Sequence, residues 1–430
     1  MPVAPGRVGT LTDEQSEKLR EMWAAAFKVF GQTVSNTNSA ASSPGLKPPS
    51  TGEANGSPVS SVSKRGRFAR MLSRTKSEAS LQETSTANTD KYGASAAYKE
   101  ALAQQSPAEI RQTFWSMVKA DHPDALLLRF LRARKWDVQK ALEMMIATNH
   151  WRGKVMEVEK IVERGEAGFL EDGDEAFMLQ VRKGKSILHG TDVEGRPICL
   201  VRSRLHRPAE QSAKTMEQFT VLTMETARLM LRGPIDTATV IFDLNGIEAK
   251  YMDLTPVRFI IKCFEAHYPE SLGTCCIYGA PWFFRPIWSI VKGLLDPVVA
   301  AKIKFANSQQ ELSEIIPQSD IIKELGGPRA WEYEYIEPVE GENDRQKDTA
   351  TRDRLIAERG EIVDKFVALT QQWVAGQQDE KSEADRHAVA KELEQDYWRL
   401  DPYVRARTHY DRVGYIESDG AYNPRATFPS

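Results

Sequence analysis

The chain has 430 residues, with 57 basic and 60 acidic side chains and a net charge of −3 at pH 7. This length leaves room for two or three domains, and a hydrophobic share of 41% is enough for an apolar core. The balanced charge argues against a general nucleic-acid binder. No uncharged apolar run reaches the roughly 18 residues that a membrane span needs, and an N-terminal signal core is absent. The four cysteines form no disulfide framework and no zinc-binding spacing, which fits a reducing compartment.

The first expected element is a helix over residues 11–30, within an N-terminal segment assigned to residues 1–30. Thr12 and Gln15 have the spacing of a capping box, and Gly31 follows the helix end. The apolar side chains recur at helical spacing and form one stripe: Leu19, Met22, Trp23, Ala26, Phe27 and Phe30. Because so short a helix is unstable alone, we expect the stripe to dock, either on the chain's own core or on a partner or membrane.

Residues 31–92 are expected to form a disordered linker, since Ser, Thr, Asn, Ala, Gly and Pro dominate them. Within the linker, residues 64–76 carry six basic side chains and no acidic one. This basic segment either binds an anionic membrane surface or is a solvated tail. Ser73 and Ser77 each follow an arginine by three positions, a spacing typical of kinase sites, and a phosphate there would weaken the attraction to a membrane.

Helical patterns fill residues 95–165 and predict a small α-helical domain. Over residues 172–335 the pattern changes to short uninterrupted apolar runs separated by helical stretches, which is typical of a parallel sheet covered by helices. The expected strands are 197–201, 238–242, 275–278 and 302–305, and the expected helices are 215–232, 255–267 and 283–295. The predicted fold class is therefore α/β, with a helical lobe and a mostly parallel sheet.

Residues 340–430 are interpreted as a helical C-terminal extension. Two amphipathic helices are expected there, at residues 355–374 and 383–400. Their sequence by itself indicates no function.

No catalytic or metal-binding pattern is recognisable in the sequence. Residues 183–186 (KGKS) resemble the end of a phosphate-binding loop, but Leu179 stands where the first glycine of that loop belongs. A nucleophile elbow and a dinucleotide-binding fingerprint are missing as well. Cys263 and His267 lie four residues apart, which an ordinary helix face explains. We therefore expect neither an enzyme nor a bound cofactor or metal ion.

Residues 281–295 (PWFFRPIWSIVKGLL) form an unusually aromatic and apolar helix. Arg285 and Lys292 exclude a membrane span. The helix could lie at a membrane surface with its aromatic side inward, or cover the sheet as a core helix. Pro286 and Gly293 are candidate hinges.

Seven motifs follow one another in the middle of the chain. They are LLRFLRARKWD at 127–137, HGTDVEGRP at 189–197, FDLNG at 242–246, YPE at 268–270, AP at 280–281, LDP at 295–297 and LGG at 325–327. Together they make residues 95–330 resemble the CRAL-TRIO lipid-binding family, and within it the fungal phosphatidylinositol transfer proteins. The long linker and the C-terminal extension resemble the longer, non-classical members.

The resemblance implies a deep apolar cavity closed by a mobile gate helix, here residues 283–301. The gate and cavity side chains would be Trp282, Phe283, Phe284, Ile287, Trp288 and Val291. The family's inositol head-group residues fall on Arg134, Lys135, Glu270 and Lys302. The three cations would neutralise the lipid phosphodiester, and Glu270 would accept hydrogen bonds from inositol hydroxyls or orient Lys302. The alternative is that these four residues form ordinary surface ion pairs and helix caps.

The chain departs from the family pattern at two places. Val299 stands where relatives often have a threonine near the phosphate, and the lost hydrogen bond should weaken head-group affinity by about 1 kcal/mol. Ala238 and Val240 stand where members that bind two lipids have serine and threonine. We therefore expect poor phosphatidylcholine binding and a more apolar second ligand, such as a sterol, squalene or another lipid.

The sequence is thus interpreted as a phosphatidylinositol transfer and presentation protein that exchanges lipids with membranes by opening the gate helix. The alternative is a carrier or sensor of one sterol-like or squalene-like lipid, without inositide transfer. The expected partners are phosphatidylinositol, a second apolar lipid, a membrane surface and lipid kinases, but not nucleic acid. The expected location is the cytoplasm, with peripheral association to membranes such as the endoplasmic reticulum or the endosome.

Overall fold

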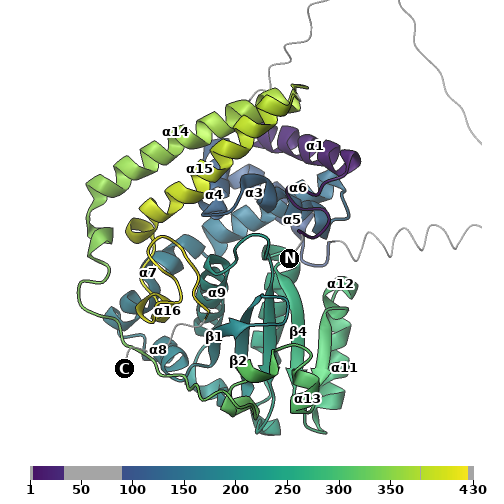
Figure 1. Ribbon diagram of the computed structural model, residues 1–430, viewed down its shortest axis with the longest axis vertical. Coiled ribbons are helices and arrows are strands. Elements are labelled where there is room, and N and C mark those ends of the chain that lie inside the picture. The colour runs from purple at the N-terminus through teal and green to yellow at the C-terminus, as the bar shows by residue number, and fades with distance from the viewer. Residues whose placement is uncertain (1–2, 33–89, 378, 425–430) are drawn as a thin grey trace, which may run out of the picture. The chain divides into compact units, whose positions relative to one another are not determined.

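The computed structural model describes residues 3–32, 90–377 and 379–424 (Figure 1). Most of the linker, with the basic segment 64–76 and with Ser73 and Ser77, therefore lies outside the described residues.

The N-terminal helix α1 (Asp13–Val29) begins at the expected capping box, in which Thr12 and Gln15 each accept a hydrogen bond from the other's backbone N–H. Its apolar stripe is buried against α5, α6 and α14 of the same chain. Trp23 is fully buried, and its indole N–H donates to the Asp124 carboxylate at 2.7 Å. Of the two docking alternatives, the structure therefore has the helix packed on the chain's own core.

Several helices of the helical lobe begin at a capping signal that is visible in the sequence. Ser106 and Glu109 cap α4, Pro123 occupies the first position of α5, and Asp137 caps α6. The helices of this part are α3 (Ala94–Gln104), α4 (Pro107–Val118), α5 (Pro123–Ala133), α6 (Val138–His150) and the π-helical turn Trp151–Val155.

The two long C-terminal helices, α14 (Thr349–Val374) and α15 (Glu380–Val404), run side by side (Figure 1). Both of them contribute side chains to the apolar core that holds α1, α4, α5 and α6. Phe366 of α14 is fully buried, with its ring centroid 5.8 Å from that of Trp23. The C-terminal helices thus complete the core of the helical lobe.

The sheet has five strands in the order β1-β2-β3-β4-β5. They are β1 (Ser186–Thr191), β2 (Pro197–Arg202), β3 (Ala238–Asp243), β4 (Leu272–Tyr278) and β5 (Ile303–Ala306). Strands β2 to β5 are parallel, and β1 pairs antiparallel with β2, so the mostly parallel α/β fold is confirmed.

Strand β1 is an element that the sequence analysis did not predict. It follows the KGKS stretch, in which Gly184 adopts φ +58° and turns the chain from α8 (Glu175–Arg182) into the strand. The stretch is therefore a turn between a helix and an edge strand. Six residues interrupted by Gly190 give too short an apolar run to be recognised as a strand.

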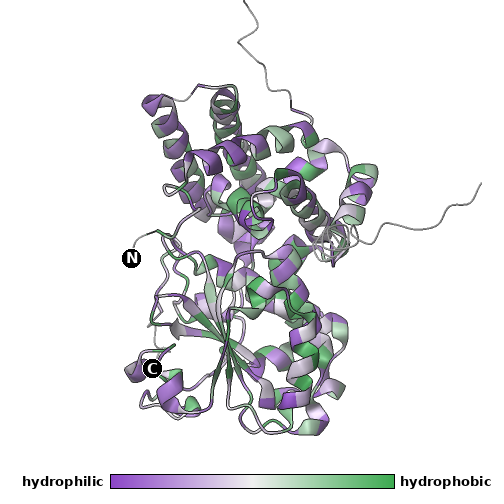
Figure 2. Cartoon of the chain, turned by 90° about the vertical axis from the view of Figure 1, so that its right-hand side faces the viewer, coloured by the Kyte–Doolittle hydropathy of each residue, from purple (hydrophilic) through white to green (hydrophobic). Residues whose placement is uncertain are grey.

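The remaining elements connect or cover the strands and the long helices. They are α7 (Val158–Glu171), α9 (Ala213–Leu229), α10 (Leu254–Lys262) with the π-helical turn Cys263–His267, α11 (Phe284–Leu294), α12 (Pro297–Ala300), α13 (Gln309–Leu312), α16 (His409–Arg412) and short 3₁₀ turns at 203–205, 208–210, 249–251, 318–320, 323–325 and 344–347. Figure 2 shows helices beside the sheet that carry both hydrophobic and hydrophilic residues, as expected for elements with one buried face. None of the helices in the described part of the chain combines the length and the apolarity that a membrane crossing requires.

Alternation along the strands gives the two faces of the sheet different roles. On one face, Ile198, Ile241 and Cys276 pack against the apolar residues of segment 312–325 and form a filled core. On the other face, side chains such as Val240 line open space. Since successive strand residues point to opposite faces, the same short apolar runs build a solid layer and the wall of a cavity.

Candidate functional site

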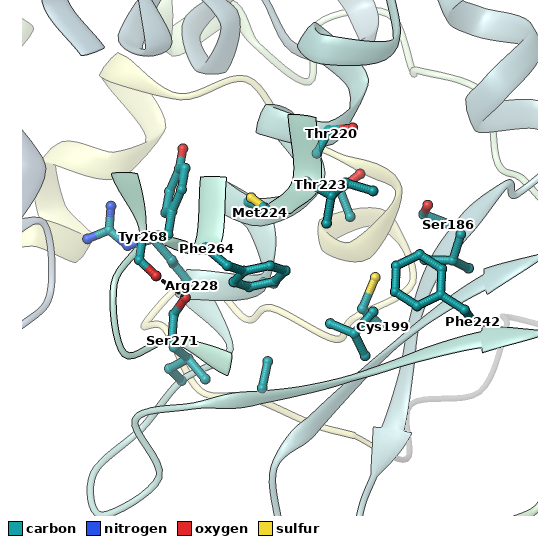
Figure 3. Close-up of a pocket in the computed structure, with 16 residues that line it drawn as sticks. Ser186, Cys199, Thr220, Thr223, Met224, Arg228, Phe242, Phe264, Tyr268 and Ser271 are labelled. Carbon is teal, nitrogen blue, oxygen red and sulfur yellow. Dashed lines mark hydrogen bonds between the residues drawn. The ribbon is translucent and has the colours of Figure 1, made fainter. Parts of the chain in front are cut away.

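An apolar cavity lies between the open face of the sheet and the helices α9, α10 and α11. It consists of two pockets that share lining residues, with open space of about 1260 Å³ and about 700 Å³, including the parts open to solvent. Figure 3 shows the smaller pocket, where Cys199 and Phe242 project from the strands toward the space that Phe264 borders from a helix. The two pockets together match the size of a ligand with long hydrocarbon chains.

The floor of the smaller pocket includes both positions that the sequence analysis singled out on β3. Ala238 and Val240 line it, and Val240 also lines the larger pocket. A methyl and an isopropyl group offer no hydrogen bond, so this part of the wall is hydrocarbon. The consequence for phosphatidylcholine binding stays a prediction.

Helix α11, the expected gate helix, borders the larger pocket with its inner face. Phe284, Ile287, Trp288 and Val291 line the pocket, four of the six expected gate and cavity residues. Trp282 lies before the helix and is 85% exposed, and Phe283, which is half-buried, precedes the first helical residue. Val299 on α12 also lines the pocket.

Two of the four expected head-group residues lie together. The Lys302 ammonium is 3.8 Å from the Glu270 carboxylate, and both side chains are partly exposed. Glu270 has φ +55° and lies two residues before the start of β4, while Lys302 directly precedes β5. Because parallel strands start at the same edge of the sheet, the topology brings these two residues to one place.

Arg134 and Lys135 lie at the C-terminal end of α5. Arg134 is the residue after the last helical one and donates to the carbonyl oxygen of Ala133 at 3.2 Å, whereas the Lys135 side chain is exposed. The same helix is attached to the Glu270 turn, since Arg129 donates to the Glu270 carbonyl oxygen at 2.8 Å. The helix end and the turn are thus neighbours, and the turn carries the Lys302–Glu270 ion pair.

The structure adds cations to this region that the sequence analysis missed. Arg7 of the N-terminal segment and Arg132 of α5 both contact the Asp236 carboxylate, at 2.8 and 3.4 Å. Arg132 also donates to the Gly6 carbonyl oxygen at 2.8 Å. Burial, with the charges of Arg129 and Arg7, lowers the pKa of Arg132 to about 10. The region beside Glu270 therefore carries excess positive charge. No local sequence motif indicates this, because Arg7 and Asp236 lie 229 positions apart in the chain.

The cysteines have no reactive environment. All four are free, and burial raises the pKa of the thiols of Cys199, Cys275 and Cys276 to about 12. His267 stacks on Trp151 with ring centroids 3.9 Å apart, and burial lowers its pKa well below the usual value. Among the described residues, no group of three or more His, Cys, Asp or Glu side chains is arranged to hold a metal ion.

Comparison with known proteins matches both lobes to one family. Residues 97–147 match the CRAL/TRIO N-terminal domain, and residues 181–327 match the CRAL/TRIO domain. The chain is 40% identical over 419 residues to the CRAL-TRIO domain-containing protein C3H8.02 of Schizosaccharomyces pombe, covering 97% of this chain and 93% of that protein. The chain belongs to the CRAL-TRIO family.

A second CRAL-TRIO relative carries a more specific name. The phosphatidylinositol transfer protein CSR1 of Eremothecium gossypii is 37% identical to the chain over 433 residues, covering 96% of this chain and 99% of that protein. The Sec14 cytosolic factor of Schizosaccharomyces pombe is 30% identical over 220 residues, covering 47% of this chain and 74% of that protein. The similarity to CSR1 therefore includes the N-terminal helix and the C-terminal helices.

Proposed function

We propose that this CRAL-TRIO protein transfers and presents phosphatidylinositol by exchanging it with membranes. The observation that carries the proposal is an apolar cavity behind a single helix, α11, with a group of cations at the starting edge of the sheet. The similarity to a named phosphatidylinositol transfer protein over nearly its whole length supports it.

The energetics favour exchange at a membrane over release into water. A lipid with two acyl chains exposes about 30 methylenes, and at roughly 0.8 kcal/mol each, exposure to water costs on the order of 25 kcal/mol. Transfer from a bilayer into a hydrocarbon-lined cavity is close to neutral, so it runs in both directions. The protein binds and releases its ligand only while it touches a membrane, and it leaves with the cavity closed.

The head-group residues select the lipid. Lys302, Arg134 and Lys135 supply positive charge for a phosphodiester, and the Glu270 carboxylate accepts hydrogen bonds from inositol hydroxyls while it orients Lys302. Val299, at the same end of the gate segment, offers the phosphate no hydrogen bond. The polar head must find partners or stay in water, so this end of the cavity determines specificity.

The gate opens by movement of segment 283–301 about its ends. Pro286 and Gly293 mark positions where the backbone of α11 lacks an N–H or a side chain. The outer side of this segment leaves Trp282 85% and Ile290 52% exposed, and these residues enter the membrane surface peripherally while the gate is open. The protein then works in the cytoplasm and visits membranes in turn.

A second candidate function is the transport or sensing of one apolar lipid without inositide transfer. The hydrocarbon wall at Ala238 and Val240 favours it, because these two side chains offer a choline phosphate no hydrogen bond. Mass spectrometry of the lipids that co-purify with the protein separates the two functions. Phosphatidylinositol among them supports the first, and its complete absence supports the second.

The decisive experiment replaces Lys135 and Lys302 together by alanine and measures transfer of labelled phosphatidylinositol between vesicles. We expect transfer to be abolished while the fold and the uptake of an apolar ligand persist. The matched control is the double variant Lys365→Ala/Lys381→Ala, which removes two exposed lysines from the C-terminal helices. Normal transfer by the first double variant would refute the head-group assignment.

A further inference from the structure

The larger pocket has a polar end that the head-group assignment does not use. Lys185, His206 and Asp253 line it there, together with the hydroxyl-bearing side chains of Ser203 and Tyr251. The backbone N–H of Arg202 donates to the Lys185 carbonyl oxygen, and Arg202 pairs with Asp243, the last residue of β3. Lys185 is therefore at the level where β2 and β3 end.

The head-group residues lie at the opposite edge of the sheet. The N–H of Ala238, the first residue of β3, donates to the Ser271 carbonyl oxygen, next to Glu270. From Ala238 to Asp243 the strand makes five steps, which at roughly 3.3 Å each separate the two edges by roughly 16 Å. The cavity thus has cations near both ends, and Lys185 belongs to a second polar site.

Lys185 is buried, and within the described ranges no carboxylate forms an ion pair with it. It is 3% exposed, and its ammonium contacts His206 Nδ1 at 3.3 Å, Gln211 Oε1 at 3.2 Å and the sulfur of Met216 at 3.7 Å. The nearby Glu210 is bound by Lys183 at 2.7 Å. Burial lowers the pKa of Lys185 to about 8, so the amine is still mostly protonated at pH 7. One of its three protons has only a thioether, a weak acceptor.

His206 provides a second donor at the same place. Because the ammonium can only donate, His206 Nδ1 must accept, which leaves the ring proton on Nε2. Nε2 is buried and lies 3.4 Å from Asp253, but it has no hydrogen-bond partner in the described part of the chain. A buried positive charge, and an N–H whose contact with Asp253 is as long as 3.4 Å, thus face the end of a hydrocarbon-lined cavity.

We propose that Lys185 and His206 bind the carboxylate of a long-chain fatty acid whose tail extends along the cavity toward α11. One carboxylate balances the single charge of Lys185 and accepts from both donors. Two donors are too few for a phosphate, and the Asp253 carboxylate would repel a doubly charged phosphate more strongly than a singly charged carboxylate. The inference rests on the proposed function only in that the cavity holds lipid, and it names the chemical class of the second ligand.

The test compares ligands on the delipidated full-length protein and needs no variant. Binding of labelled oleate, methyl oleate and squalene is measured by competition. We expect oleate to bind about tenfold more tightly than its methyl ester, since a charge-assisted pair is lost in the ester. Equal binding of oleate and methyl oleate would overturn the proposal, as would a preference for squalene.

Variants then assign the effect to the site. Lys185→Met keeps the volume of the side chain and should weaken oleate binding about tenfold, with methyl oleate unchanged. The matched control is Lys214→Met, at an exposed position of α9 outside the lining. Unchanged oleate binding by a folded Lys185→Met protein would overturn the proposal.

Phosphatidylinositol transfer separates this proposal from the proposed function. Lys185→Met should still transfer inositide, and Lys135→Ala/Lys302→Ala should still bind oleate. If the second variant transfers inositide normally, the head-group assignment fails, and the fatty-acid site still stands or falls by the oleate comparison alone.

Discussion

At the scale of single residues, the part of the cavity wall that β3 forms lacks hydroxyl groups at two positions. Ala238 and Val240 lie on the open face of β3, and neither side chain can form a hydrogen bond with a ligand. A hydroxyl placed there would point into the cavity, since both positions share one side of the strand.

We therefore expect Ala238→Ser/Val240→Thr to raise phosphatidylcholine binding severalfold, because each new hydroxyl contributes about 1 kcal/mol when it finds a partner. Vesicle binding with labelled phosphatidylcholine measures the effect. Ala227→Ser is the control, since it adds a hydroxyl to the same pocket from α9. An unchanged affinity in the double variant would refute our interpretation of this strand.

A buried histidine makes stability depend on pH. Burial, and then the charge of Arg329, lowers the pKa of His189 to about 3, from an ordinary value of 6.5. Below pH 6.5 the unfolded chain binds a proton at His189 that the folded protein does not bind. The contribution of the neutral His189 to the free energy of unfolding is therefore complete above pH 6.5 and is lost as the pH falls toward 3.

Replacing this histidine should flatten the pH dependence of the free energy of unfolding. Well below pH 6.5, the slope should decrease by up to about 1.4 kcal/mol per pH unit in His189→Gln, the equivalent of one proton. His122, with its pKa lowered to about 4 by burial, still contributes in the same direction. Urea titrations between pH 5 and 7 measure the slopes, and identical slopes would contradict the assignment.

At the scale of elements, α11 separates a cavity from the outside. Its inner face lines the larger pocket with Phe284, Trp288 and Val291. Its outer face leaves Ile290 exposed, and Trp282 is exposed just before it. A helix with an apolar inner face, and with exposed Ile290 beside the bases Arg285 and Lys292 on its outer face, can cover an apolar cavity and can also lie at a membrane surface.

We expect Trp282→Ala to weaken binding to vesicles about tenfold, because an indole that inserts contributes roughly 1.5–3 kcal/mol. Transfer should slow accordingly, while the amount of lipid bound in the cavity stays the same. Ser289→Ala is the control, as an exposed position of the same helix. Vesicle flotation measures the binding, and normal flotation of Trp282→Ala would remove this residue from the membrane contact.

At the scale of the whole molecule, the N- and C-terminal helices share one buried ion pair with the helical lobe. The Arg386 guanidinium of α15 donates to both carboxylate oxygens of Asp124 on α5, and Trp23 of α1 donates to the same carboxylate. Burial alone would raise the pKa of Asp124, but Arg386 and His122 lower it to about 2. Three distant parts of the chain thus meet at one carboxylate.

Removing one partner of this pair should be far more costly than removing both. Arg386→Leu leaves the Asp124 charge buried and should lower the free energy of unfolding by about 3–5 kcal/mol. Arg386→Leu/Asp124→Leu should recover a large part of that loss, because no uncompensated charge remains. Urea unfolding gives the values, and a double variant as unstable as the sum of its single variants would show that the pair does not act as a unit.

Several elements were predictable because the signals that start them are local. Thr12 with Gln15, Pro123 and Asp137 lie within one turn of the helices that they begin. The parallel strands β2 to β5 were recognisable as apolar runs, and the family motifs located the candidate head-group residues. Strand β1 was missed because its six residues form a strand only by pairing with β2 and resting on the core.

The sequence alone determined the order of helices and strands, the fold class and the family resemblance, because capping residues and apolar periodicity act between near neighbours. Only the tertiary structure decided which face of the sheet stays hollow, that Arg7 reaches Asp236, and that Lys185 is buried at the polar end of the cavity beside His206. These features depend on contacts between residues far apart in the chain, and such contacts exist only once the strands have paired and the helices have packed.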